Sequence, residues 1–157
     1  MRLLQILILS ILLMSSKVQA QEQPEPVVNW ISFEQLGDSL DSNPKPVLIF
    51  FHTDWCSYCK KMLRETFRNK EVIEKLNSEY YAVEFDAESI DSVLFDGVTY
   101  TNSSSRKRTG NYHELFKILM GESKKHVFPT TLIMNANFSV KTKKINYLSI
   151  KQILNIL

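Results

Sequence analysis

Hydrophobic positions along the chain follow two spacings, one typical of buried strands and one typical of amphipathic helices. Val47–Phe51 is a continuous apolar run, as expected for a central strand buried on both faces. Other segments carry apolar residues at helical spacing, and Ser32 with Gln35 predicts a capping box at the start of the first of them. The expected helices cover residues 30–40, 60–67, 70–77, 112–120 and 150–157, and the expected strands cover residues 47–51, 80–85, 127–134 and 138–145.

The expected order is a helix, a strand, two helices and a second strand, then an insertion that contains a helix, then two further strands, of which the first follows Phe128-Pro129-Thr130, and a last helix. This order predicts an α/β fold with a central mixed β-sheet flanked by helices. The insertion covers residues 88–128 and is either a surface for substrates or partners or an elaborated edge of the fold. Within it, Asp96-Gly97 predicts a tight turn between two short strands. The basic run Ser105–Arg108 is expected to be a solvated loop.

The first 20 residues have the pattern of an export signal. Arg2 precedes an apolar run from Leu3 to Met14, and Val18 and Ala20 fit the small-residue pattern that signal peptidase accepts. The run is short for a membrane span of about 20 residues, although an uncleaved N-terminal anchor is the alternative. We expect a signal peptide at residues 1–20, a flexible leader at 21–29 and one domain at 30–157. The domain is expected to be exported to the periplasm or another extracytoplasmic space.

Composition is that of one globular domain and gives no sign of a nucleic-acid partner. The chain has 157 residues, of which 44% are hydrophobic and 23% are charged, enough apolar material for a core. Its formal net charge is +2, and Arg2 and Lys17 in the N-terminal segment account for that excess. We therefore expect no nucleic-acid partner, and membrane contact only through the N-terminal segment if it is retained.

The chain has two cysteines, Cys56 and Cys59, and they lie three residues apart. Thiol–disulfide exchange needs a thiolate nucleophile and a second thiol that resolves the mixed disulfide. Cys56 is expected at the N-terminus of a helix, where the helix dipole and free N–H groups stabilise a thiolate, so it is the predicted nucleophile. Cys59 is expected one turn into the helix and more buried, which suits the resolving role. Lys60 and its neighbours add positive charge along that helix.

A pair of cysteines at this spacing is also half of a zinc site, and this is the alternative reading. Zinc needs four ligands, so the others would be drawn from His52, His113 and His126. Histidines that bind zinc are usually separated by about three to five residues. His113 and His126 lie much further apart in the sequence. We therefore expect no metal and no organic cofactor.

The chain carries an apolar strand, then the segment Thr53-Asp54-Trp55-Cys56-Ser57-Tyr58-Cys59-Lys60, and much later Phe128-Pro129-Thr130. With these motifs it resembles the thioredoxin superfamily. More narrowly, it is similar to exported bacterial thioredoxin-like proteins. The resemblance covers about residues 30–157 and implies a thioredoxin-like fold with an insertion before the strand that follows a cis-proline.

The resemblance also implies roles for residues around the cysteines. It implies that Pro129 is the cis-proline facing the disulfide, and that the backbone of Phe128 binds an extended substrate segment. Trp55 is expected to pack beside the disulfide and to shape the docking surface. Ser57, Tyr58 and Lys60 are expected to support substrate binding.

The chain departs from many thioredoxins at two places. Phe50 stands where they carry a buried aspartate, six residues before the first cysteine, so that proton acceptor is missing, and Asp54 and Glu84 are candidates to replace it. The dipeptide between the cysteines is Ser57-Tyr58 rather than Gly-Pro, which leaves the direction of electron flow open. His52 either tunes the thiolate or is simply packed at the strand end. His126, three residues before Pro129, either borders the active site or is a solvated loop residue, and the solvated loop residue is expected.

Together these features predict an exported thiol–disulfide oxidoreductase acting on protein thiols and disulfides. It would work as a monomer and would depend on a redox partner protein to reset its cysteines. The alternative is a thioredoxin-fold binding module that holds partners near Trp55 and Pro129 without redox turnover.

Overall fold

The computed structural model describes residues 25–121 and 125–157, so the expected signal peptide at residues 1–20 lies outside the described residues. The helices are α2 (Phe33–Ser42), α3 (Ser57–Arg64), α4 (Lys70–Glu79), α5 (Glu114–Met120) and α6 (Ile150–Leu154), with a short 3-10 helix, η1 (Thr66–Arg68). The strands are β1 (Val47–His52), β2 (Tyr81–Asp86), β3 (Val93–Phe95), β4 (Val98–Tyr100), β5 (Thr130–Met134) and β6 (Val140–Lys144). None of the described helices is both long and apolar enough to cross a bilayer.

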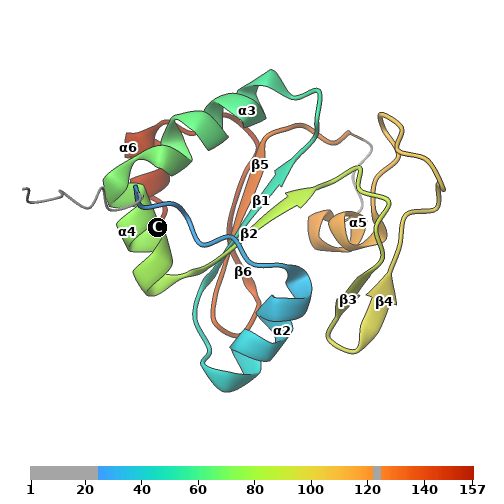
Figure 1. Cartoon of the computed structure of the whole chain (residues 1–157), viewed down its shortest axis with the longest axis horizontal. Coiled ribbons are helices and arrows are strands. Elements are labelled where there is room, and N and C mark those ends of the chain that lie inside the picture. The colour runs from blue at the N-terminus through green and yellow to red at the C-terminus, as the bar shows by residue number, and fades with distance from the viewer. Residues whose placement is uncertain (1–24, 122–124) are drawn as a thin grey trace, which may run out of the picture.

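Four strands form the central sheet in the order β2-β1-β5-β6 (Figure 1). β1 runs parallel to β2 and antiparallel to β5, and β6 pairs antiparallel with β5. The mixed sheet predicted from the order of elements is therefore confirmed. β1 is central and its first five residues are fully buried, as its continuous apolar sequence predicts.

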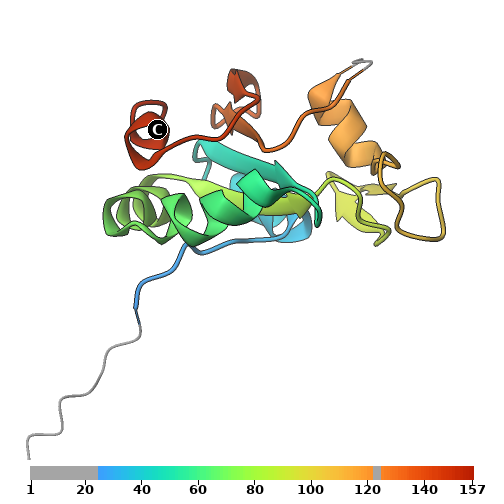
Figure 2. The same cartoon turned by 90° about the horizontal axis from the view of Figure 1, so that it is seen from above.

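Helices cover both faces of the sheet, and each face has its own hydrophobic cluster. Side chains of α3, α4 and α6 pack with Leu48 and Phe50 on one face. Side chains of α2 and α5 pack with Ile49 and Phe51 on the other. Figure 2 shows α4 and α6 at one end of the molecule and the hairpin of β3 and β4 at the other.

Capping residues explain most differences between the predicted and observed helix starts. α2 begins at Phe33 rather than residue 30 because Ser32 caps it in the predicted capping box with Gln35. α5 begins at Glu114 rather than residue 112 because the ring of His113 accepts a hydrogen bond from the amide of Leu115. The α3 helix begins at Ser57, three residues earlier than predicted, because Cys56 is itself the cap.

Two predicted segments are shorter than their apolar pattern suggests. β6 begins at Val140 rather than residue 138, because Phe138 has φ +59° and completes the turn after β5. The last helix ends at Leu154 rather than residue 157. Before the first helix, Val28 is buried and Asn77 forms hydrogen bonds with the backbone of Val27 and Asn29, so the packed chain extends N-terminal of residue 30.

The hairpin of β3 and β4 has the turn that its sequence predicts. Asp96 and Gly97 both have positive φ, 51° and 71°, as a type I′ turn requires. The hairpin packs against α2 through Phe95, whose ring centroid lies 5.4 Å from that of Phe33. The hairpin of β3 and β4 is therefore a packed part of the domain that lies against α2.

Candidate active site

Cys56 and Cys59 form a disulfide at the N-terminus of α3, with an S–S distance of 2.03 Å. Cys56 is the N-cap residue, and its sulfur accepts a hydrogen bond from the amide of Cys59 at 3.1 Å. The first turn of a helix leaves its amide N–H groups without intrahelical partners, and the helix dipole is positive there, so this helix end favours negative charge on the sulfur. Cys59 lies within the helix and is 1% exposed, against 4% for Cys56. The first cysteine is thus the one at the helix end, as the sequence analysis predicts.

The peptide bond between Phe128 and Pro129 is cis, and it lies at the same edge of the sheet as the disulfide. Thr130, which follows Pro129, pairs with Phe51 near the end of β1, and the cysteine motif follows that end of β1. The ring of Phe128 lies edge-on to the ring of Trp55, with centroids 6.0 Å apart. Trp55 and Phe128 therefore flank the same short stretch of surface.

Trp55 is held in place by a buried carboxylate that the sequence analysis does not identify. Its indole Nε1–H donates to Glu88 at 3.0 Å, and the amide of Gly110 donates to the other Glu88 oxygen at 2.7 Å. Glu88 is only 2% exposed, whereas Trp55 is 53% exposed. The position of Glu88 just after β2 could have identified it as a site residue. The carboxyl ends of parallel neighbouring strands such as β1 and β2 meet at one edge of a sheet, and the cysteines follow β1 at that edge.

A lysine of the inserted loop also reaches this edge. Lys107 forms ion pairs with both Asp54, two residues before Cys56, and Asp86, the last residue of β2. The hydrogen bond from Lys107 holds the pKa of Asp54 below its usual range. Burial acts to lower the pKa of Lys107, but its hydrogen bonds to the two aspartates outweigh that effect and raise it. The prediction that Ser105–Arg108 is simply a solvated loop is therefore wrong for Lys107.

The remaining predicted site residues on α3 lie on the surface. Ser57 and Lys60 are exposed, and Tyr58 is 62% exposed, with its ring centroid 6.2 Å from that of Tyr147. All three residues belong to the first turn of α3, next to the disulfide in the sequence.

Phe50 lies in the hydrophobic cluster that contains Cys59, at the place where many thioredoxins carry a buried aspartate. Of the two suggested replacements, Asp54 is held by Lys107. Glu84 lies opposite Phe50 in β2 and forms an ion pair with His52 at 3.3 Å. Burial raises the pKa of Glu84, and the nearby His52 opposes that rise. His52 is therefore packed at the end of β1 against Glu84 and Phe50.

The histidines proposed as zinc ligands have other partners. His113 is fully buried and caps α5, and its Nε2 lies 3.0 Å from the carbonyl oxygen of Asp91. His126 packs edge-on against Tyr112 and Phe116, so the expectation of a solvated loop residue is wrong. Among residues 25–121 and 125–157, no three histidine, cysteine or acidic side chains converge as a metal site would need.

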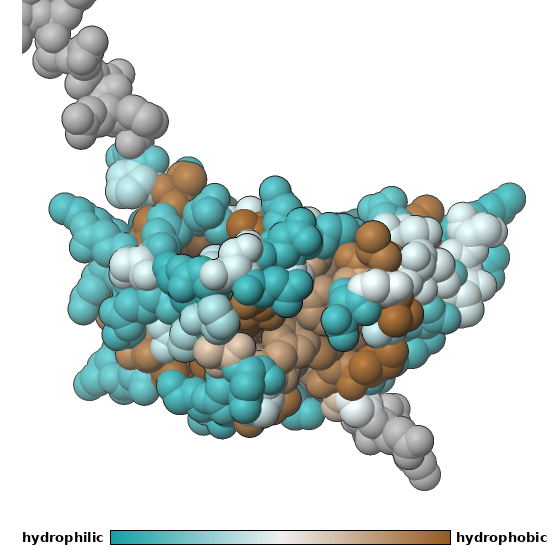
Figure 3. Space-filling model, turned by 90° about the horizontal axis from the view of Figure 1, so that it is seen from below, coloured by the Kyte–Doolittle hydropathy of each residue, from teal (hydrophilic) through white to brown (hydrophobic). Residues whose placement is uncertain are grey.

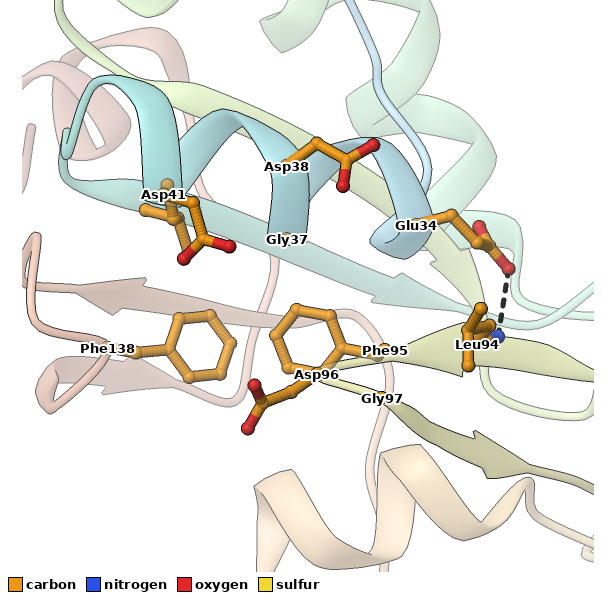
Figure 4. Close-up of a pocket in the computed structure, with 10 residues that line it drawn as sticks. Glu34, Gly37, Asp38, Asp41, Leu94, Phe95, Asp96, Gly97 and Phe138 are labelled. Carbon is orange, nitrogen blue, oxygen red and sulfur yellow. Dashed lines mark hydrogen bonds between the residues drawn. The ribbon is translucent and has the colours of Figure 1, made fainter.

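A groove lies away from the disulfide, between α2 and the hairpin of β3 and β4. It has a volume of about 410 Å³. Figure 4 shows the rings of Phe95 and Phe138 facing each other below α2, with Asp38 and Asp41 on the helix above them. Figure 3, which views this end of the molecule, shows apolar surface around a hollow bordered by hydrophilic side chains. The groove lies near the start of β1, whereas the cysteines follow the other end of this strand.

Residues 34–154 match the family model described as a thioredoxin-like domain. A segment of 47 residues is 34% identical to the thiol:disulfide interchange protein DsbD of Campylobacter jejuni. That segment is 30% of this chain and only 8% of DsbD.

Solved structures share the fold at low sequence identity. The DsbH oxidoreductase superposes with a TM-score of 0.55 at 17% identity, covering 90% of this chain and 92% of that one. A putative disulphide-isomerase from Bacteroides thetaiotaomicron gives a TM-score of 0.56 at 18% identity, covering 85% and 91%. These similarities establish the thioredoxin-like fold predicted from the sequence.

Proposed function

The chain belongs to the thioredoxin-like family, and from that premise we propose that it is an exported thiol–disulfide oxidoreductase in which Cys56 attacks and Cys59 resolves. The observation that carries the proposal is the Cys56–Cys59 disulfide at the start of α3, with Cys56 as the helix cap. The activity class, exchange of disulfides with thiols, follows from the family together with this formed disulfide. The order of attack and the export are our inferences.

In the reducing direction, the Cys56 thiolate attacks one sulfur of a substrate disulfide. A mixed disulfide forms, and the other substrate sulfur leaves as a thiolate that takes up a proton. Cys59 then loses its proton and attacks the Cys56 sulfur, which releases the second substrate thiol and forms the intramolecular disulfide. Two electrons pass from the protein to the substrate, and the oxidising direction runs the same steps in reverse.

The surroundings support Cys56 as the attacking sulfur. The helix end and the Cys59 amide stabilise negative charge on it, and Lys107 neutralises the nearby Asp54. Trp55, Tyr58 and Phe128 form an apolar surface around it that an extended substrate segment can contact. The backbone before Pro129 offers hydrogen-bonding groups at the end of β5 for such a segment.

We also propose that protein substrates and a separate redox partner meet at this one surface, because the chain has no cysteine beyond this pair to reset it. Export to the periplasm is supported by the apolar segment between Arg2 and Ala20. Mass measurement of the protein recovered from a bacterial envelope fraction is expected to place its first residue at Gln21. A protein that retains Met1 in the cytoplasm would contradict export.

The test of the redox function is insulin reduction with dithiothreitol as the electron donor. Wild type is expected to accelerate precipitation of the insulin B chain, and Cys56→Ser is expected to lose that activity. Cys59→Ser should instead accumulate mixed disulfides, visible as bands that disappear on reduction. The double variant Cys56→Ser/Cys59→Ser is the control and should trap nothing. Thiol-independent binding of partners by that double variant, with no turnover by wild type, would favour the binding-module alternative.

A further inference from the structure

We infer that the inserted loop Thr101–Gly110 is a basic wall of the substrate site, and that Arg106 and Arg108 select protein segments with an acidic residue beside the reactive cysteine. This inference rests on the proposed function and names the class of substrate that the site prefers. It assigns a role to the part of the chain between β4 and α5, which the sequence analysis leaves open between a substrate surface and an elaborated edge.

The loop is fixed at the edge of the sheet that carries the disulfide. Lys107 pairs with Asp54 and Asp86, and the amide of Gly110 donates to Glu88, the same carboxylate that holds Trp55. A side chain of the loop also holds it against the neighbouring backbone. Asn102 donates to the carbonyl oxygens of Ser89 and Asn111 at 2.9 Å and 3.0 Å. These contacts give the loop a defined position relative to Cys56.

An open hollow lies between the loop and Trp55. Its volume is about 370 Å³, and its lining residues are Asp54, Trp55, Glu88, Lys107, Arg108 and Thr109. Trp55 directly precedes Cys56 and also contacts Phe128, so the hollow opens beside the surface where substrate is expected. A substrate side chain next to the reacting cysteine therefore has a space to enter, and Arg108 forms part of its wall.

The acidic groups around this hollow have partners that neutralise or bind them, whereas, among the described residues, the arginines of the loop do not. Asp54 and Asp86 share the ammonium group of Lys107, and the Glu88 carboxylate is buried against two N–H donors. Arg108 lines the hollow, and Arg106 lies two residues before it in the same loop. Both are exposed, and within the described part of the chain neither guanidinium forms an ion pair. Guanidinium groups bind carboxylates through two parallel hydrogen bonds, so a substrate carboxylate is the matching ligand.

The spacing fits a residue close to the substrate cysteine. An extended segment advances about 3.3 Å per residue, so a side chain one or two residues from the cysteine lies within about 7 Å of it along the chain. Glutamate and aspartate at those positions can reach the wall while the cysteine meets Cys56. Lysine at the same positions would meet like charge, so discrimination comes from repulsion as well as attraction.

The experiment uses three synthetic peptides, each linked to its own copy by one disulfide. They differ only in the residues flanking the cysteine, which are Glu, Gln or Lys. Exchange with the reduced full-length protein releases two peptide thiols and oxidises Cys56 and Cys59, and it is followed by chromatography. Each rate constant is divided by the rate constant of the same peptide with dithiothreitol, which removes the effect of the flanking charge on intrinsic reactivity.

Wild type is expected to prefer the Glu peptide over the Lys peptide by about fivefold or more at low salt, and the ratio should approach one in 0.5 M sodium chloride. Arg106→Gln/Arg108→Gln is expected to reduce the ratio below about twofold, because exchange with the Glu peptide slows and exchange with the Lys peptide does not. The control Arg68→Gln/Lys70→Gln removes the same charge from η1 and the start of α4 and should keep the wild-type ratio.

Two results would overturn the inference while leaving the proposed function intact. One is Cys56-dependent exchange with all three peptides at equal normalised rates. The other is a preference for Glu that the loop variant keeps, or that the control variant loses equally. Absence of exchange with every peptide, including the Gln peptide, would instead contradict the proposed function itself, and the inference would fail with it.

Discussion

Glu88 shows how a single residue can be essential to a site without a recognisable pattern in the sequence. A buried carboxylate is costly unless hydrogen bonds replace its lost water. Here Trp55 and Gly110 supply two N–H donors, from either side of the carboxylate. Burial raises the pKa of the Tyr112 phenol, and the negative charge of Glu88 adds to that rise. Glu88 therefore links the residue before Cys56, the inserted loop and the aromatic cluster near Pro129.

His126 leads to a prediction about pH. Burial lowers its pKa from the ordinary value of 6.5, and Lys117 and Lys143 add to that effect. The unfolded chain therefore binds the proton more tightly than the folded chain. The stability that neutral His126 contributes is fully present above about pH 6.5 and is lost as the pH falls through the folded pKa.

The expected result is a smaller loss of unfolding free energy between pH 8 and pH 5 for His126→Gln than for wild type. Glutamine cannot titrate, so the variant lacks this one source of pH dependence. Urea unfolding of the oxidised proteins at both pH values measures the difference. Equal pH dependence in the two proteins would mean that the packing of His126 against Tyr112 and Phe116 does not disfavour the charged ring.

The elements carry these residues to one edge of the sheet through their order along the chain. β1 and β2 are parallel, so Asp54 and Asp86 follow their strands at the same end. β5 is antiparallel to β1, so its first residue meets the end of β1. The loop between β4 and α5 closes the arrangement by placing Lys107 between the two aspartates. The site is thus assembled from four chain segments that are distant in sequence.

Removal of the Lys107 charge should affect both the loop and the thiolate. In Lys107→Met, Asp54 and Asp86 lose their shared cation, and the unneutralised Asp54 lies two residues from Cys56. The Cys56 thiolate is then expected to form at higher pH, because nearby negative charge disfavours it. Ultraviolet absorbance of the reduced protein against pH measures this midpoint.

Lys107→Arg is the matched control, since it keeps the positive charge. Its thiolate midpoint is expected to stay close to that of wild type. The loop of Lys107→Met should also be cleaved faster by trypsin after Arg108, because its attachment to the sheet edge is weakened. An unchanged midpoint in Lys107→Met would show that the ion pairs serve the loop alone.

At the scale of the whole molecule, the fold follows from local patterns to a large extent. The apolar run of β1, the Ser32–Gln35 capping box and the Asp96-Gly97 turn each act through neighbouring residues, and the structure confirms all three. The start of α5 differs from the prediction because His113 caps the helix, and histidine is not a usual cap. The apolar pattern alone places the start of α3 at residue 60, whereas the expected position of Cys56 at a helix N-terminus agrees with the observed start at Ser57.

The parts of the candidate site that were missed depend on contacts between distant segments. Glu88 and Gly110 are 22 residues apart, and Lys107 and Asp54 are 53 apart. A basic run such as Ser105–Arg108 looks the same in a sequence whether it faces water or closes on two aspartates. The cysteine motif could be predicted without any contact between distant segments, because the helix that begins at the motif is formed by the residues directly after Cys56.

The sheet also separates the disulfide from the groove between α2 and the hairpin. The groove residue Phe138 follows β5, whose last residue Met134 pairs with Val47 at the start of β1. The cysteines follow the other end of β1, so the strand of six residues, about 20 Å long, lies between them. Changes in the groove are therefore expected to alter stability without altering disulfide exchange.

Gly37 and Gly97 both line the groove. Replacing each by alanine tests this separation, because the two substitutions are expected to have opposite effects on stability. Gly37 lies inside α2, and a Cβ there would meet nothing within 4 Å, so Gly37→Ala is expected to stabilise the protein by about 0.5–1 kcal/mol. Gly97 has φ +71°, so Gly97→Ala is expected to destabilise it by about 1–2 kcal/mol. Urea unfolding measures both, and insulin reduction by both variants should equal that of wild type. A change of more than about threefold in either rate, a difference of roughly 0.7 kcal/mol in barrier, would show that the groove communicates with Cys56.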